Sequence, residues 1–253
     1  MLNDMIYTIA RILWLLLCWL ELILFTIPLY LLSFLPAHMI KPFYPVLFHA
    51  WSRSFVRALG VDLRLHQKNA RPLPERYILI ANHPSAFEDI GIPALFKVSS
   101  LAKIQVKDWW ISGRISQASG TLFVDRDSKE SRAAAVQSIE QALISGKNIA
   151  LYPEGGCKGR RLHSSFRYGA FDISLKTGIP IVPVFLHYES QQDFEWPDRV
   201  LLIQKIRDFM STQNNRVNYY VHDAFEPQNF ESKEVYCEHV YQQYLKWQAR
   251  YLE

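Results

Sequence analysis

The chain begins with a long apolar segment that has almost no polar interruption. Between Ile12 and Leu35 the only charged residue is Glu21. A segment of this length is long enough to cross the ~30 Å hydrocarbon core of a bilayer, but Pro28 lies within it, and a proline inside a helix kinks or ends that helix. The pattern therefore fits either one membrane-spanning helix or a broken helix that enters a single leaflet. A buried helix of a soluble domain fits less well, because Trp and Leu occur on all sides.

The next segment, residues 45–61, has an amphipathic helical pattern. Leu47, Trp51 and Phe55 recur at every fourth position, while Arg53 and Arg57 share another face. A helix of this kind can lie among lipid headgroups, or it can pack on its own domain. We therefore predict that residues 1–60 form a membrane-docking helical segment and that residues 61–253 form a separate domain.

From about residue 62 onward, short apolar segments alternate with helical patterns. This alternation is typical of the α/β fold class, in which a sheet is covered by helices. Pro180 and Pro183 favour a strand start or a sheet edge for residues 179–188. Strands are predicted at 77–81, 101–106, 120–124, 148–152, 179–188, 200–206 and 216–222, and helices at 85–96, 107–119, 128–146, 169–178 and 233–250.

The composition narrows the class of protein further. The 253 residues are 49% hydrophobic and 21% charged, which is typical of a globular chain and excludes a disordered one. The net charge of +4 suits an anionic membrane or a phosphorylated substrate. The three cysteines are far apart and lack metal-ligand spacing, so we expect no disulfide framework, no metal and a reducing compartment. We expect no cofactor and no nucleic-acid partner.

Polar residues that could take part in catalysis or binding follow three of the predicted strands. His83 follows the first in "NHPSAFED", Arg126 follows a second in "GTLFVDR", and Pro153 to Gly156 follow a third in "YPEGG". Ligands of open α/β sheets gather at such strand ends. Arg binds phosphate in a bidentate way, and glycines let backbone N–H groups approach an anion. The chain has neither a nucleotide-binding P-loop nor a G-x-S-x-G nucleophile motif.

Together these blocks resemble those of the glycerolipid acyltransferase family. Its N-H-x-x-x-x-D, G-x-x-F-x-x-R, F-P-E-G-T and V-P-V blocks correspond here to "NHPSAFE" (82–88), "GTLFVDR" (120–126), "YPEGG" (152–156) and "IVPVFL" (181–186). The resemblance covers roughly residues 50 to 225. It implies an O-acyltransferase of phospholipid synthesis that moves an acyl chain from acyl-CoA or acyl-carrier protein to the free hydroxyl of a lysophosphatidate-type acceptor.

The resemblance also implies roles for individual residues and a location. His83 would be the catalytic base, Arg126 the phosphate ligand, and Glu154 with Gly155 the acceptor-binding pair, with Lys158 and Arg160 supplying further positive charge. The enzyme would lie on the inner membrane, with its catalytic domain on the cytoplasmic side. Two alternatives remain open: an acceptor such as a lyso-ornithine lipid or another lysophospholipid, and a catalytically silent lipid-binding homologue.

The sequence departs from the family pattern at two places. The position of the family's aspartate holds Glu88, and Asp89 follows it. Because it stands at the family's position, Glu88 is the predicted partner of His83. Glu88 also completes the helix-capping pattern S-x-x-E from Ser85; if it only caps the helix, Asp89 is the alternative partner, although a carboxylate with two oxygens can fill both roles.

The second departure is that Gly156 and Cys157 replace the usual Thr-Arg. This change leaves the identity of the acceptor more open than the catalytic residues. A nucleophilic role for Cys157 would need a nearby base, which the sequence does not reveal.

Overall fold

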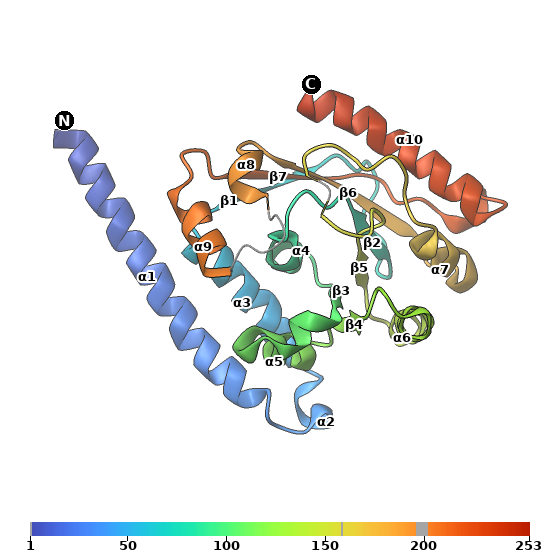
Figure 1. Cartoon of the computed structure of the whole chain (residues 1–253), viewed down its shortest axis with the longest axis horizontal. Coiled ribbons are helices and arrows are strands. Elements are labelled where there is room, and N and C mark those ends of the chain that lie inside the picture. Colours follow the sequence, from blue (N-terminus) through green and yellow to red (C-terminus); the bar gives the residue numbers. More distant parts are fainter. Residues whose placement is uncertain (1, 158, 196–201) are drawn as a thin grey trace.

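The computed structural model describes residues 2–157, 159–195 and 202–253. Its centre is a seven-stranded sheet with the strand order β1-β7-β6-β2-β5-β3-β4 (Figure 1). Only β6 and β7 pair in antiparallel fashion; the other neighbouring strands are parallel. The strands are β1 (Asp62–Gln67), β2 (Ile78–Ala81), β3 (Ser99–Lys103), β4 (Leu122–Val124), β5 (Ile149–Leu151), β6 (Ile181–Tyr188) and β7 (Arg216–Val221).

Helices cover both faces of this sheet, which confirms the predicted fold class. Ile78 and Ile80 of β2 belong to one core, whereas Leu79 and Ala81 belong to the other, because successive side chains of a strand point to opposite faces. Burial on both faces explains why the central strands are continuously apolar. The core that contains Leu79 is covered by α3 (Tyr44–Ala58), α4 (Glu88–Leu95), α8 (Gln191–Phe194) and α9 (Leu202–Ser211). The core that contains Ile78 is covered by α6 (Lys129–Ile144), α7 (Gly169–Thr177) and α10 (Lys233–Leu252).

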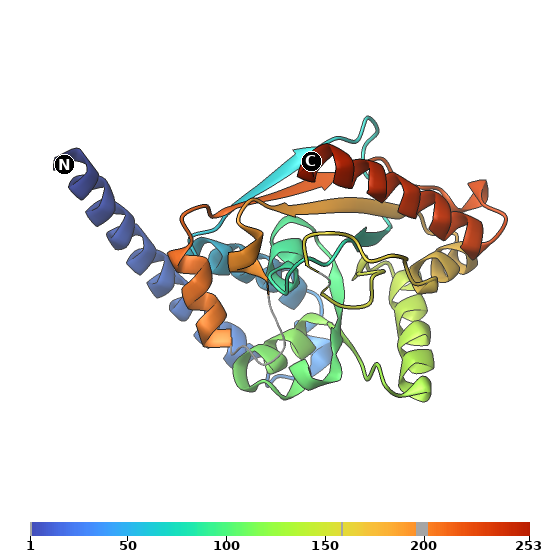
Figure 2. The same ribbon diagram turned by 45° about the horizontal axis from the view of Figure 1, so that its top comes forward.

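The apolar N-terminal segment forms one long helix, α1 (Leu2–Leu32), which continues through Pro28. It packs on α3 through Cys18, Leu22 and Leu29, and Trp51 Nε1 donates a hydrogen bond of 2.8 Å to Thr26 Oγ1. Most of its other apolar side chains are exposed, which argues against a buried helix of a soluble domain. Figure 2 shows its N-terminal end standing clear of the rest of the molecule. By length and composition, α1 is one helix that could cross a membrane.

The remaining elements lie between α1 and α3, between β3 and β4, and between β7 and α10. They are α2 (Ala37–Ile40), the 3-10 helix η1 (Ile104–Asp108), α5 (Trp110–Ser119) and the 3-10 helix η2 (Pro227–Asn229). The predicted strand 101–106 therefore ends at Lys103 and continues as η1. The helix predicted at 107–119 forms as α5, which ends at Gly120 in the left-handed conformation.

One predicted strand is wrong. Of the strand predicted at 200–206, residues 202–206 are helical, as the start of α9, while 200 and 201 lie outside the described residues. In this helix Lys205 and Phe209, four residues apart, face inward, a spacing that the apolar start of the segment concealed.

Of the two placements expected for the strand at 179–188, a strand start at Pro180 fits and a sheet edge does not. The strand β6 lies inside the sheet rather than at its edge. Proline lacks an N–H, so it is tolerated where no neighbouring strand needs that donor. Pro183 lies opposite His222, which is beyond the end of β7, and its carbonyl still accepts the His222 N–H.

The boundary predicted at residue 60 separates segments that share a core. Val56 of α3 and Leu59 just after it belong to the same cluster as Leu79 of β2 and Ile92 of α4. The helix α3 thus packs on the sheet domain on one side and on α1 on the other. We propose that the folded unit begins with α3, and that α1 and α2 are its attachments.

A chain that starts at Asp62 is therefore expected to lose cooperative unfolding, whereas one that starts at Tyr44 keeps it in detergent. The shorter chain loses Val56 and Leu59 from the core. Removing even single buried aliphatic side chains costs roughly 2–5 kcal/mol, against a total stability of about 5–15 kcal/mol. Thermal unfolding followed by circular dichroism compares the two chains. Equal melting temperatures would contradict the assignment of α3 to the folded unit.

Candidate active site

The candidate active site lies where the parallel neighbours β2 and β5 end. His83 follows β2, and Tyr152 to Cys157 follow β5. Because both strands run in the same direction, their carboxyl ends bring these two loops to the same edge of the sheet. The loops border a cavity of about 1170 Å³ that α1, α3, α5 and α9 also line. Its polar lining includes His83, Asp89, Lys103, Arg126 and Cys157.

The loop that carries His83 is fixed from both sides. The side chain of Asn82 donates to the Leu186 carbonyl at 3.0 Å and accepts from the Leu186 N–H at 2.7 Å. The His83 N–H donates to Glu154 Oε1 at 2.7 Å. The imidazole stacks on the Tyr152 ring, with centroids 4.1 Å apart. His83 is therefore held as a rigid group at the cavity wall, although it is only 6% exposed.

Glu88 both fixes the turn before a helix and faces His83. Its Oε1 accepts the Ser85 N–H at 2.8 Å, as the capping pattern predicts, while its Oε2 lies 3.4 Å from His83 Nδ1. Glu88 is the first residue of α4 and is fully buried. Asp89, by contrast, is exposed and lines the cavity. The 3.4 Å separation exceeds a normal hydrogen bond, as is common before substrate binds.

Charges around His83 shift the pKa values of the pair. Burial lowers the pKa of His83, but the Cys157 thiol and the Glu88 carboxylate outweigh it, so the net shift is upward. Burial raises the pKa of Glu88, which the imidazole only partly offsets. A carboxylate beside Nδ1 leaves Nε2 to accept a proton. His83 can therefore act as a general base whose ring is oriented by the carboxylate of Glu88.

The predicted acceptor-binding residue Glu154 has a different use in the structure. Its Oε1 accepts the His83 N–H, and its Oε2 accepts the His163 N–H, also at 2.7 Å. The side chain is 4% exposed and is absent from the described lining of the cavity. Glu154 thus joins the loop after β2 to the loop after β5. We propose that Glu154 positions His83 rather than binding the acceptor, because both of its carboxylate oxygens already accept backbone N–H groups.

The predicted phosphate ligand Arg126 does line the cavity. Its Nη1 donates to the Gly155 carbonyl at 2.8 Å. Burial and the nearby guanidinium of Arg167 lower the pKa of Arg126. Gly155 has φ +78°, and a Cβ there would lie 2.3 Å from Arg167 Nε. Only glycine therefore fits between the two arginines, and two neighbouring guanidinium groups attract an anion with more than one negative charge.

The structure does not place the other two predicted basic residues, Lys158 and Arg160, beside Arg126. Arg160 Nη2 donates to the Leu252 carbonyl at 3.2 Å at the end of α10, and Arg160 is not among the described residues that line the cavity. Lys158 lies outside the described residues. We propose that Arg167, which the sequence blocks do not mark, supplies the second positive charge beside Arg126. No local pattern could have identified it, because it reaches the site from the loop before α7.

Cys157 has the neighbouring base that the sequence does not reveal. Its Sγ lies 3.5 Å from His83 Nε2 and 3.9 Å from Nδ1. A sulfur nearly equidistant from both ring nitrogens lies beside the ring rather than along one lone pair, so it is poorly aligned for proton transfer. Among the described residues there is also no group of His, Cys, Asp or Glu that could hold a metal ion.

The fold and the site together define a class of protein. Residues 62–187 match the family model described as Acyltransferase, and this part of the chain belongs to that family. All four blocks noted in the sequence, from Asn82 to Leu186, fall inside it. The resemblance to glycerolipid acyltransferases is thereby confirmed.

Individual relatives agree with this class. The 1-acyl-sn-glycerol-3-phosphate acyltransferase of Neisseria meningitidis is 26% identical over 142 residues, 55% of this chain and 54% of that protein. The lyso-ornithine lipid O-acyltransferase of Pseudomonas aeruginosa is 27% identical over 154 residues, 61% of this chain and 58% of that protein. The alignments thus span little more than half of these relatives. The crystal structure of the 1-acyl-sn-glycerophosphate acyltransferase PlsC from Thermotoga maritima, 18% identical, has the same fold, with a TM-score of 0.58 over 96% of both chains.

Glu88→Gln is expected to reduce acyl transfer almost as much as His83→Ala, by roughly 10²–10⁴-fold, with little loss of thermal stability. The glutamine oxygen still accepts the Ser85 N–H, but its amide would donate to Nδ1 and place the proton on Nε2, the nitrogen that must act as base. Without the carboxylate, the acidic limb of the kcat/KM profile should move to lower pH, because the pKa of His83 falls.

The matched control is Asp89→Asn, which is expected to keep most of the activity. Glu88→Ala removes the cap as well and should also cost about 1 kcal/mol of stability. The assignment fails if Asp89→Asn abolishes transfer while Glu88→Gln leaves it intact.

Alkylation of Cys157 is expected to inactivate the protein, because any group added to Sγ occupies the space beside Nε2. Cys157 is exposed, whereas Cys18 and Cys237 are buried, so a small maleimide should react mainly at this residue. Cys157→Ser should resist the reagent and keep activity of the same order as the unmodified protein. Loss of activity in untreated Cys157→Ser would show instead that the thiol itself takes part in catalysis.

Proposed function

We propose that this protein transfers an acyl chain from the thioester of acyl-CoA or acyl-carrier protein to the free hydroxyl of a lysophosphatidate-type glycerolipid. The observation that carries the proposal is that His83, backed by Glu88, lines the same cavity as Arg126. A base and an anion-binding group on one cavity are what transfer to the hydroxyl of a phosphorylated acceptor requires.

The geometry supports a mechanism with one base. His83 Nε2 accepts the proton of the acceptor hydroxyl, and the oxygen attacks the thioester carbonyl carbon. The Glu88 carboxylate stabilises the imidazolium that forms. When the tetrahedral intermediate collapses, the carbon–sulfur bond breaks and the imidazolium returns its proton to the departing thiolate. The products are the diacylated lipid and the free thiol of the donor.

The arginines favour a phosphomonoester as the head group of the acceptor. A phosphomonoester carries close to two negative charges near neutral pH, which matches Arg126 with Arg167 behind it. A lyso-ornithine head group would bring a carboxylate together with an ammonium group, and the ammonium group would face two guanidinium groups. Lyso-ornithine lipid is nevertheless the second candidate acceptor, because a relative named for that acceptor aligns over 154 residues, 61% of this chain.

The surroundings of the cavity favour a lipid acceptor taken from a membrane. Trp19, Leu22 and Thr26 of α1 line the cavity together with Trp51 and Phe55 of α3. The other side of α1 exposes apolar side chains. The helix α3 covers one side of the C-terminal half of α1. We therefore infer that α1 lies in one leaflet and does not span the bilayer. An acceptor in that leaflet would enter the cavity alongside α1. The proposed location on the cytoplasmic side of the inner membrane rests on the family resemblance.

The experiment that tests the function is acyl transfer from labelled acyl-CoA or acyl-carrier protein to a panel of acceptors in vesicles. We expect the highest kcat/KM with lysophosphatidate, and lower values with lysophosphatidylcholine and lyso-ornithine lipid. No transfer to any acceptor would favour the silent lipid-binding homologue. A preference for lyso-ornithine lipid would keep the mechanism but overturn the proposed head group.

Arg126→Ala is expected to raise the KM for lysophosphatidate much more than the KM for the acyl donor. A lost charge-assisted hydrogen bond is worth about 1.5–3 kcal/mol, which corresponds to roughly a ten- to hundredfold rise. Arg126→Lys should rescue it only partly, because lysine lacks the planar fork. Arg167→Gln should produce a smaller rise in the same KM. Equal effects on donor and acceptor would contradict the assignment.

A further inference from the structure

A second pocket lies at the opposite edge of the sheet from the candidate active site. It measures about 340 Å³ and lies between α2 with the turn before it, α5, and the loops that precede β4 and β5. Those loops enter the amino ends of their strands, whereas His83 and Cys157 follow carboxyl ends. No described residue lines both cavities. Its polar lining is Ser33, Lys41, Arg114, Gln117, Ser119 and Lys147.

Three of these side chains are cations, and no acidic residue in the described lining balances them. Lys41, Arg114 and Lys147 also form no ion pair in the described part of the chain. Burial and the charge of Lys41 lower the pKa of Lys147. Like charges brought together without a counterion cost free energy. An anion in the pocket would remove that cost.

The pocket wall holds Arg114 in a fixed position. Its guanidinium carbon lies 3.6 Å from the centroid of the Phe34 ring, a cation–π contact. Its Nε is buried and has no hydrogen-bond partner among the described residues. A buried donor left unpaired is costly. Arg114 also lines the pocket, and its guanidinium group is held there by the contact with Phe34.

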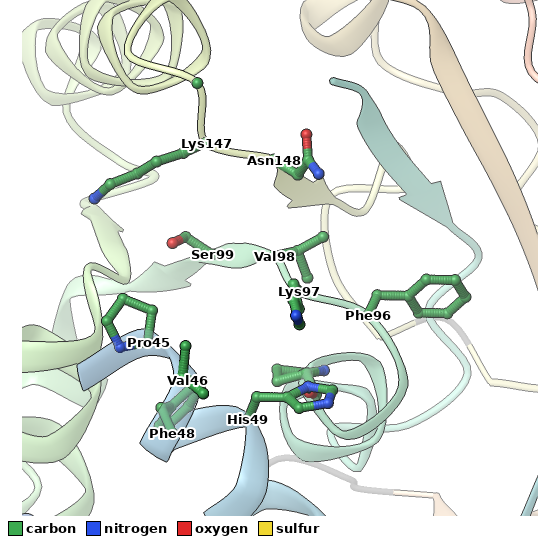
Figure 3. Close-up of a pocket in the computed structure, with 12 residues that line it drawn as sticks. Pro45, Val46, Phe48, His49, Phe96, Lys97, Val98, Ser99, Lys147 and Asn148 are labelled. Atoms are coloured by element: carbon green, nitrogen blue, oxygen red, sulfur yellow. The ribbon is translucent and has the colours of Figure 1, made fainter. Parts of the chain in front are cut away.

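The side chain of Lys147 points from a neighbouring cavity towards the pocket. That cavity, of about 250 Å³, shares Pro45 and Lys147 with the pocket. Figure 3 shows the side chain of Lys147 extending away from Phe96 and Asn148. Across the pocket, a Cβ on Gly120 would lie 3.0 Å from Lys147 Nζ. The ammonium group thus reaches into the pocket beside a residue that has no side chain to obstruct it.

The rim of the pocket is apolar and exposed. Leu35 lines the pocket and Phe34 contacts Arg114, and both side chains are exposed. A cationic pocket with an apolar rim matches a lipid, whose charged headgroup is joined to hydrocarbon chains. A free anion would use the cations but not the rim.

We propose that Lys41, Arg114 and Lys147 bind the phosphate-bearing headgroup of an anionic phospholipid, outside the active site. The site gives the protein a preference for anionic bilayers and orients it next to α1. The occupant is a membrane lipid that is not consumed. The proposal does not depend on which acceptor the active site uses.

The first test measures binding of the full-length protein to vesicles of phosphatidylcholine, with and without phosphatidylglycerol. Each basic residue near an anionic surface contributes about fivefold in affinity. The double variant Lys41→Gln, Lys147→Gln should therefore lose roughly 25-fold of the preference for anionic vesicles and bind neutral ones as before. Its melting temperature should not fall, because the substitutions remove two charges that repel each other.

The matched control removes two positive charges from the α1–α3 surface outside the pocket, with Arg11→Gln and Arg53→Gln. It is expected to keep most of the preference for anionic vesicles. If it loses as much as the pocket variant, the attraction is diffuse and the proposed site is overturned.

The second test distinguishes a lipid headgroup from a free anion by thermal unfolding in detergent. Short-chain phosphatidylglycerol should raise the melting temperature of the unmodified protein but not of the pocket variant, because a ligand that binds the folded state stabilises it. Inorganic phosphate at equal ionic strength should have little effect. An equal rise with inorganic phosphate would make this a free-anion site, and no rise with either would overturn the proposal.

Discussion

The geometry of the site depends on the buried carboxylate of Glu154. Its two oxygens accept the N–H groups of His83 and His163, so one side chain ties together the loops that follow β2 and β5. Parallel pairing brings these loops close, but pairing alone does not fix the backbone beyond the strand ends. The two hydrogen bonds do so, and being made to a charged group they are stronger than neutral ones. They hold His83 against Tyr152 and place Gly155 beneath Arg126.

A second carboxylate, Glu88, performs two tasks that are often divided between residues. Reaching back from the first position of α4 to the Ser85 N–H suits the length of Glu. Once Oε1 is held there, Oε2 has a fixed place 3.4 Å from Nδ1 of His83. The extra methylene relative to the family's aspartate therefore combines helix capping with orientation of the base. Helix start and imidazole orientation are thus coupled in this chain.

The sequence predicted what depends on local pattern and missed what depends on distant contacts. The fold class and the family follow from short segments, and they are confirmed. The segment that became α9 was mistaken for a strand because its apolar residues suit either structure, and only packing on the core decides between them. Arg160, Arg167 and Cys157 lie on loops whose paths are set by contacts with α10, Gly155 and His83. No spacing rule could have placed them.

The helix α5 lines both the candidate active site and the cationic pocket. Trp110 and Ile111, at its start, line the candidate active site, whereas Arg114 and Gln117 line the cationic pocket. From Trp110 to Gln117 the helix rises only about 10 Å, and Trp110 is 80% exposed. A bilayer that met the pocket and the exposed side of α1 would thus also meet the cavity entrance beside α5. Such a surface would fix the distance and tilt between His83 and the lipid plane, a geometric requirement for any base that acts on a hydroxyl near a headgroup.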